Sequence, residues 1–174
     1  TGPVQVEAGG QLRLVANVRD LFTIHDVLTN EGTVELGSGF NIDLNRILGP
    51  GGFVNRGLVK VLDEGHDYGR GGAAVIAVPF ENQSTGRVWV NAGSLLRLDV
   101  GEIRHAGSLQ IDRTGTLLIN NNGTRFVAMP GSQILNFGAL AMNGGTRLEL
   151  AGDLEMVGAL VNNSVVSCAG TLRL

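Results

Sequence analysis

Residues 80–99, FENQSTGRVWVNAGSLLRLD, contain two short runs of alternating apolar and polar residues that are separated by an Asn-Ala-Gly corner. Alternation with a period of two places every second side chain on the same face of a β-strand. The apolar residues are Val88 and Val90 in the first run and Leu95 and Leu98 in the second. The stretch therefore predicts two short strands joined by a corner, with these four side chains in a core.

The same pattern, a glycine followed by alternating apolar residues, recurs from one end of the chain to the other. Its ten copies begin at Gly2, Gly10, Gly32, Gly57, Gly86, Gly107, Gly115, Gly138, Gly152 and Gly170. Repeats of this size cannot bury their apolar faces alone, so they stack on their neighbours. We therefore predict an all-β fold with almost no helix, a parallel β-helix (β-solenoid) whose coils take roughly 20–25 residues. It should form a single domain over residues 1–174.

An antiparallel β-sandwich that acts as a binding module is the rival interpretation. Such a fold joins consecutive strands by two-residue turns, for which Asn-Gly and Asp-Gly are preferred sequences. Only Asn122-Gly123 and Asn143-Gly144 have this form. The scarcity of such turns favours the solenoid.

An asparagine recurs shortly before the glycine in several copies, which predicts a repeated corner. The triplet Asn-x-Gly is found at three of these places, and Asn-Gln-Ser-Thr-Gly and His-Ala-Gly stand in the same context. An asparagine side chain bonds to nearby backbone and tolerates left-handed backbone angles, and stacked copies can bond to one another. The predicted corner pairs are Asn30 with Gly32, Asn55 with Gly57, Asn82 with Gly86, His105 with Gly107, and Asn136 with Gly138.

The composition argues against several classes of protein. Hydrophobic residues make up 43% of the 174 residues and charged residues 17%, and the formal net charge is −3. The basic residues form no cluster interleaved with aromatics, so we expect no nucleic-acid partner. The apolar runs are too short to cross a bilayer, so we expect no membrane insertion. Cys168 is the only cysteine, so no intrachain disulfide can form.

Residues 53–98, FVNRGLVKVLDEGHDYGRGGAAVIAVPFENQSTGRVWVNAGSLLRL, resemble the repeats of large bacterial surface proteins and adhesin-like β-helix proteins. The positions that carry the resemblance are Asn55, Gly57, Ile76, Val78, Pro79, Phe80, Asn82, Gly86, Val88, Val90, Gly93, Leu95 and Leu98. The sequence departs from the pattern at residues 83–85, Gln-Ser-Thr, which lengthen a corner, and at Leu96, an additional apolar residue. The resemblance implies a structural architecture and an extracellular or cell-surface location in a bacterium, and it implies no catalytic residues.

The most polar stretch is residues 63–72, DEGHDYGRGG. Its carboxylates, Asp63, Glu64 and Asp67, are candidate ligands for a divalent cation, and His66 with Asp67 is a candidate acid–base pair. The alternative is a solvated insertion between coils, where charge and glycine are common. We favour the insertion, and we therefore expect no catalytic residue, no metal site and no cofactor.

Together these observations predict a protein that is not an enzyme. We expect a structural or adhesive β-solenoid of a bacterial cell-surface protein or extracellular filament, with a glycan or a host surface as its contact. Both ends lie inside the repeat pattern without a polar cap, which predicts end-to-end self-association or continuation of the same polypeptide. The alternative function is a carbohydrate-binding or polysaccharide-cleaving β-helix. Trp89, on the outer face of its strand, predicts a lateral contact or a covering loop.

Overall fold

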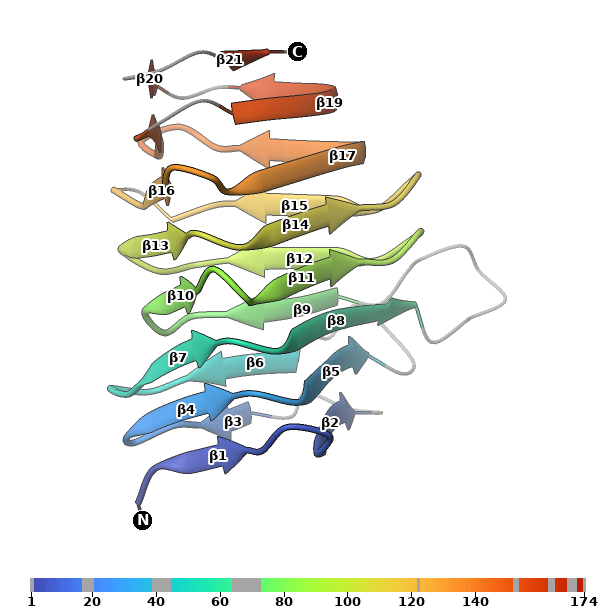
Figure 1. Ribbon diagram of the computed structural model, residues 1–174, viewed down its shortest axis with the longest axis vertical. Helices are drawn as coiled ribbons and strands as arrows, with labels where there is room; N and C mark the ends of the chain where they lie inside the picture. The colour runs from blue at the N-terminus through green and yellow to red at the C-terminus, as the bar shows by residue number, and fades with distance from the viewer. Residues whose placement is uncertain are drawn as a thin grey trace.

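A computed structural model gives the fold of residues 2–16, 21–38, 45–63, 73–121, 123–151, 154–162, 165–168 and 172–173. Every regular element in these residues is a β-strand, and every pair of neighbouring strands is parallel. The strands stack along the long axis of the molecule in chain order (Figure 1). The predicted all-β parallel solenoid is therefore confirmed, and the antiparallel sandwich is wrong.

One strand from each coil enters a first sheet of eight strands. In spatial order these strands are β1 (Val4–Val6), β4 (Val27–Asn30), β7 (Gly52–Asn55), β10 (Phe80–Asn82), β13 (Glu102–His105), β16 (Arg125–Ala128), β18 (Arg147–Leu150) and β20 (Val165–Cys168). Because the sheet is parallel throughout, equivalent residues of successive coils lie beside one another.

The second sheet consists of two columns of strands. The first column contains β2 (Gln11–Ala16), β5 (Thr33–Ser38), β8 (Leu58–Asp63), β11 (Arg87–Val90) and β14 (Ser108–Ile111). The second contains β3 (Leu21–Thr23), β6 (Asn45–Leu48), β9 (Ala73–Ile76), β12 (Leu95–Leu98) and β15 (Thr116–Ile119). The long strand β17 (Gln133–Met142) pairs with β14 through its first half and with β15 through its second, so it joins the columns. Beyond it, β19 (Leu154–Asn162) pairs with β17 and with β21 (Leu172–Arg173).

Partner residues of the first sheet show how many residues each coil takes. Their separations are 24 (Val4 to Leu28), 25 (Leu28 to Phe53), 27 (Phe53 to Phe80), 23 (Phe80 to Ile103), 23 (Ile103 to Phe126), 22 (Phe126 to Leu148) and 18 (Leu148 to Val166). Most coils fall within the predicted length, and two lie outside it. Residues between the strands absorb the differences, because the strands themselves keep their register.

The core consists of inward side chains that stack from coil to coil. In the first sheet the stack is aromatic and aliphatic, and the rings of Phe53 and Phe80 lie 5.2 Å apart between centroids. Its buried members are Leu28, Phe53, Phe80, Ile103, Phe126 and Leu148. Burial of such side chains is the main favourable term in folding, so the stack holds neighbouring coils together.

The predicted core of residues 88–98 needs one correction. Val88, Val90 and Leu98 are buried as predicted, but Leu96, with 0% exposure, occupies the inward position and Leu95 is only half-buried. Leu96 and Leu98 are two residues apart and share a face of β12, whereas Leu95 and Leu98 are three apart and face opposite sides. The additional apolar residue is therefore Leu95, on the outer face.

Candidate functional site

Four of the five predicted corner residues come together in one buried column. Asn30, Asn55, Asn82 and His105 are partners in the first sheet, at the ends of β4, β7, β10 and β13, and none is more than 2% exposed. Asn30 Nδ2 donates to Asn55 Oδ1 at 2.7 Å, and Asn55 Nδ2 donates to Asn82 Oδ1 at 2.7 Å. Asn82 Nδ2 lies 3.1 Å from His105 Nδ1. We call these four residues the corner ladder.

The hydrogen bonds of the corner ladder run in one direction. The amide nitrogens of Asn30 and Asn55 also donate to backbone carbonyls two coil positions along, those of Leu58 at 3.0 Å and Arg87 at 3.1 Å. Reversing either amide would set its oxygen against a carbonyl oxygen, and neither atom can donate. Each amide is thus held in one orientation, and the ladder presents an N–H donor to His105.

His105 is neutral in the folded protein. Its Nδ1 accepts from Asn82, so its proton is on Nε2, which donates to the Gln133 carbonyl at 3.2 Å. Burial lowers the pKa of His105 from 6.5 to about 4, and the hydrogen bond to Gln133 opposes this shift. The neutral imidazole accepts and donates as the asparagines of the preceding coils do.

The corner glycines let neighbouring coils approach closely. A Cβ on Gly57 would collide with the carbonyl oxygen of Gly32, and a Cβ on Gly107 would collide with that of Gly86. A Cβ on Gly86 itself would collide with the side-chain oxygen of Asn82. These positions are glycine because backbone or a ladder side chain occupies the space that a side chain would need.

The fifth predicted corner, Asn136 with Gly138, lies elsewhere in the coil, so that part of the prediction is wrong. Asn136 is the partner of Ile111 in the second sheet, and the first-sheet partner of His105 is Ala128. Asn136 is fully buried, and its Oδ1 accepts from the Gly138 N–H at 3.2 Å. The pair forms a local turn within β17 and is no part of the corner ladder.

Trp89 contacts side chains of the coils on either side. Lys60 Nζ lies 4.9 Å from the centroid of the indole ring, a cation–π arrangement. The indole Nε1 donates to Asp112 Oδ2 at 2.7 Å, and Gln110 Nε2 donates to Asp112 Oδ1 at 2.7 Å. Trp89 is therefore half-buried among its neighbours, although it points away from the core.

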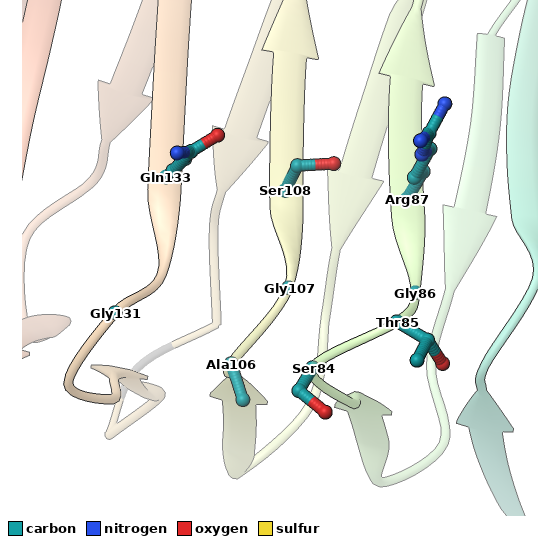
Figure 2. A pocket seen from close by; sticks show the side chains of 9 residues that line it. All are labelled: Ser84, Thr85, Gly86, Arg87, Ala106, Gly107, Ser108, Gly131 and Gln133. Carbon is teal, nitrogen blue, oxygen red and sulfur yellow. The ribbon is translucent and has the colours of Figure 1, made fainter.

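A groove crosses the outside of the solenoid where the first sheet turns into β11, β14 and β17 (Figure 2). It results from corners of unequal length in three successive coils. The outer two corners have three residues between strand and corner, at 83–85 and 129–131, whereas the middle corner has Ala106 alone. The longer corners form the two walls, and Ala106 and Gly107 form the floor between them.

Backbone hydrogen bonds fix both walls. The Gly86 N–H donates to the Gln83 carbonyl at 2.8 Å and closes the first turn, and the Ser132 N–H donates to the Met129 carbonyl at 3.1 Å and closes the second. The Ala106 N–H donates to the Asn82 carbonyl at 2.7 Å, which ties the floor to the coil beneath it. The groove is thus bounded by hydrogen-bonded backbone.

The groove has a polar lining and a volume of about 450 Å³. Arg87, Ser108 and Gln133 come from three neighbouring strands, and the side chains of Ser108 and Gln133 point toward the strand that carries Arg87 (Figure 2). The lining residues are Ser84, Thr85, Gly86, Arg87, Ala106, Gly107, Ser108, Gly131 and Gln133. The arrangement offers one cation with hydroxyl and amide groups, and it contains no carboxylate. The inserted residues 83–85 are the only sign of the groove in the sequence.

The candidates in the polar stretch lie mostly beyond what can be described. Glu64, His66 and Asp67 are outside the described residues, and Asp63 is the last residue of β8. Within the described ranges, no group of three or more histidine, cysteine, aspartate or glutamate side chains is placed to hold a metal ion. Nor do those ranges contain a helix long and apolar enough to cross a membrane.

Comparisons with protein-family models, with curated proteins and with solved structures give no match for this chain. Its function therefore has to be inferred from the arrangement of its own residues.

Proposed function

We propose that the chain is a structural and adhesive β-solenoid of a bacterial cell-surface protein or extracellular filament, and that it carries out no catalysis. The corner ladder is the observation that carries this proposal. Its four buried polar side chains bond to one another and to backbone across successive coils, so their hydrogen-bonding capacity serves coil stacking. Buried polar networks whose members are satisfied make a fold rigid and specific.

The arrangement of carboxylates on the outer surface supports the same role. Arg125 bridges three coils, with Nη1 3.0 Å from Glu102 and Nη2 2.7 Å from Glu149. Its hydrogen bonds hold the pKa of the Glu149 carboxyl below its usual range. Glu31 pairs with Arg56 across the coil boundary at 3.2 Å. Carboxylates held ionised by arginines suit a stacking role better than that of a general acid.

The proposed setting is an extended assembly outside the cell. Solenoid coils continue by parallel pairing of strand edges, so the partners are a second copy stacked end to end or further coils of the same polypeptide. A glycan or a host surface is the proposed contact of the lateral faces. The resemblance of residues 53–98 to repeats of bacterial surface proteins supports this setting.

The second candidate function is that of a carbohydrate-binding or polysaccharide-cleaving β-helix. The groove between the corners favours the binding half of this alternative, because its polar lining faces solvent. Cleavage would need an acid and a base in a suitable arrangement, for which His66 and Asp67 are the candidates from the sequence. Both lie outside the described residues.

Two measurements test the proposed function. Antibodies raised against the purified chain should label intact cells of the source organism as strongly as permeabilised cells. Labelling that requires permeabilisation would contradict a surface location. In parallel, the purified chain should release no oligosaccharide from a panel of plant, bacterial and animal polysaccharides. Release that disappears in Asp67→Asn would show an enzyme instead.

A further inference from the structure

We infer that the groove between turns 83–86 and 129–132 is a binding site for an acidic carbohydrate, a sugar residue that carries a carboxylate. This inference deepens the adhesive part of the proposed function and rests on it, since it gives the adhesive contact a location and a chemical class. Shape, charge and hydrogen-bonding capacity point to this ligand.

The shape of the groove suits a small hydroxylated ring or a short stretch of polymer. Its volume of about 450 Å³ lies within the range of roughly 300–1,000 Å³ that is typical of small-molecule sites. Turns on both sides form its walls, and the small residues Ala106 and Gly107 keep its floor low. In two earlier coils the single corner residue is Glu31 or Arg56, and a side chain of that size at position 106 would fill the hollow.

The charge of the groove selects an anion. Arg87 is exposed and is the single charged residue of the lining, which includes no aspartate or glutamate. Over the ranges that the structure describes, its guanidinium forms no ion pair and no hydrogen bond, unlike Arg56, Arg97 and Arg125, which all bind carboxylates. A guanidinium matches a carboxylate with two parallel hydrogen bonds. The cation is therefore available for an external carboxylate.

The neutral lining selects hydroxyl groups next to that carboxylate. Among described atoms, the side chains of Ser84, Ser108 and Gln133 make no hydrogen bond, and all three line the groove beside Arg87. A serine hydroxyl and a glutamine amide can each donate and accept, as sugar hydroxyls can. Arg87, Ser108 and Gln133 lie on consecutive strands at a spacing of about 4.8 Å, so a polymer along the solenoid axis would meet them in turn.

Calorimetric titration of the purified chain with oligogalacturonate tests the site, and the fully methyl-esterified oligomer is the matched ligand control. We expect binding of the free acid, and at least about tenfold weaker binding of the ester, because the ester cannot form the charged hydrogen bonds. Equal binding of both forms would overturn the inference. Equal binding of dextran sulfate would also overturn it, because it would show attraction to any polyanion.

Three variants localise the binding. Arg87→Gln removes the cation, and Ala106→Gln fills the floor with a side chain of the size that Arg56 has in an earlier coil. Both should weaken oligogalacturonate binding at least about tenfold while the urea unfolding midpoint stays close to that of the parent protein. Arg113→Gln, which removes an exposed arginine just beyond the far end of β14, is the control and should bind normally.

Unchanged binding in Arg87→Gln, or equal losses in Arg113→Gln, would show that the ligand does not occupy this groove. Failure of this inference is distinguishable from failure of the proposed function. A chain that labels intact cells but does not bind the acid would lose the site and keep the surface role.

Discussion

At the scale of single residues, His105 ends the corner ladder where the next coil offers no amide. Its first-sheet partner there is Ala128, so an asparagine at position 105 would have no side chain to donate to. The imidazole instead reaches the Gln133 carbonyl through Nε2 and packs on Phe126, with ring centroids 5.7 Å apart. Both ring nitrogens are thereby bonded, which leaves no buried polar atom of the ring unpaired.

We expect the stability of the protein to fall as pH decreases through the range in which an unfolded histidine becomes protonated. The pKa of His105 is about 4 in the folded state and 6.5 as the model value for an unfolded histidine, so between these values the unfolded chain binds more protons. The contribution of His105 to the free energy of unfolding is therefore full above pH 6.5 and decreases by up to about 3 kcal/mol toward pH 4. Urea unfolding followed by circular dichroism over this pH range measures the slope.

The matched variant for this prediction is His105→Asn, because asparagine fills the equivalent position in three coils. Asparagine has no proton to gain in this range, so the stability of the variant should depend less on pH. Other titrating groups contribute equally to both proteins. Identical slopes for the two proteins would contradict the protonation linkage of His105.

At the scale of elements, β12 shows how strictly alternation assigns a side chain to the core. Leu96→Ala should lower the free energy of unfolding by about 3 kcal/mol, because Leu96 is fully buried and a smaller side chain leaves a cavity. Leu95→Ala changes the same atoms at the next position, but Leu95 is half-buried on the outer face, so we expect a loss below about 1 kcal/mol. Equal losses in urea unfolding would mean that the register of β12 is different.

The contact between successive corners gives a second comparison. Gly107→Ala should destabilise the protein by about 3 kcal/mol, because its Cβ would collide with the Gly86 carbonyl oxygen, which is backbone and cannot rotate away. Gly101→Ala is the control, since no atom lies within 4 Å of a Cβ built there. Thermal unfolding of both variants measures the difference. A normal transition for Gly107→Ala would show that the coils can move apart at this corner.

The strands could be predicted from the sequence because alternation is a local property, whereas the position of a turn around the coil is not. Asn136 with Gly138 has the same Asn-x-Gly triplet as Asn30 with Gly32. It also makes the same local bond, from the glycine N–H to the asparagine Oδ1, at 3.2 Å and 3.1 Å respectively. A bond between residues two apart contains no information about which sheet the turn belongs to. At the true corner position stands Ala128, whose side chain has no polar atom to mark it.

At the scale of the whole molecule, each coil is stabilised by the coils on either side of it. The strand β10 pairs with β7 and β13, whereas β1 pairs with β4 alone. We expect amide hydrogens of β10 and β11 to exchange more slowly than those of β1, because opening at an edge breaks one interface and opening in the middle breaks two. Hydrogen exchange measured by mass spectrometry tests this. Uniform protection along the chain would indicate that all coils open together.

The whole molecule also decides what could not be predicted about the groove. The insertion at residues 83–85 is visible in the sequence, and so is the turn at 129–131, but nothing local shows that they face each other across Ala106. The two corners become near neighbours because the two intervening coils each take 23 residues, from Phe80 to Ile103 and from Ile103 to Phe126. Coil length depends on every turn in the coil, so the groove follows from stacking.

The single direction of the hydrogen bonds in the corner ladder has a consequence for how such a chain can evolve. Every asparagine accepts from the coil before it and donates to the coil after it, so the coils from Asn30 to Asn82 are interchangeable at this corner. Duplication or loss of one coil as a block, residues 55–81 for example, joins an asparagine to an asparagine and leaves the bond to His105 as it is. In-frame recombination between repeated gene segments could thus change the length of the molecule in whole coils, with the histidine retained as the end of the series.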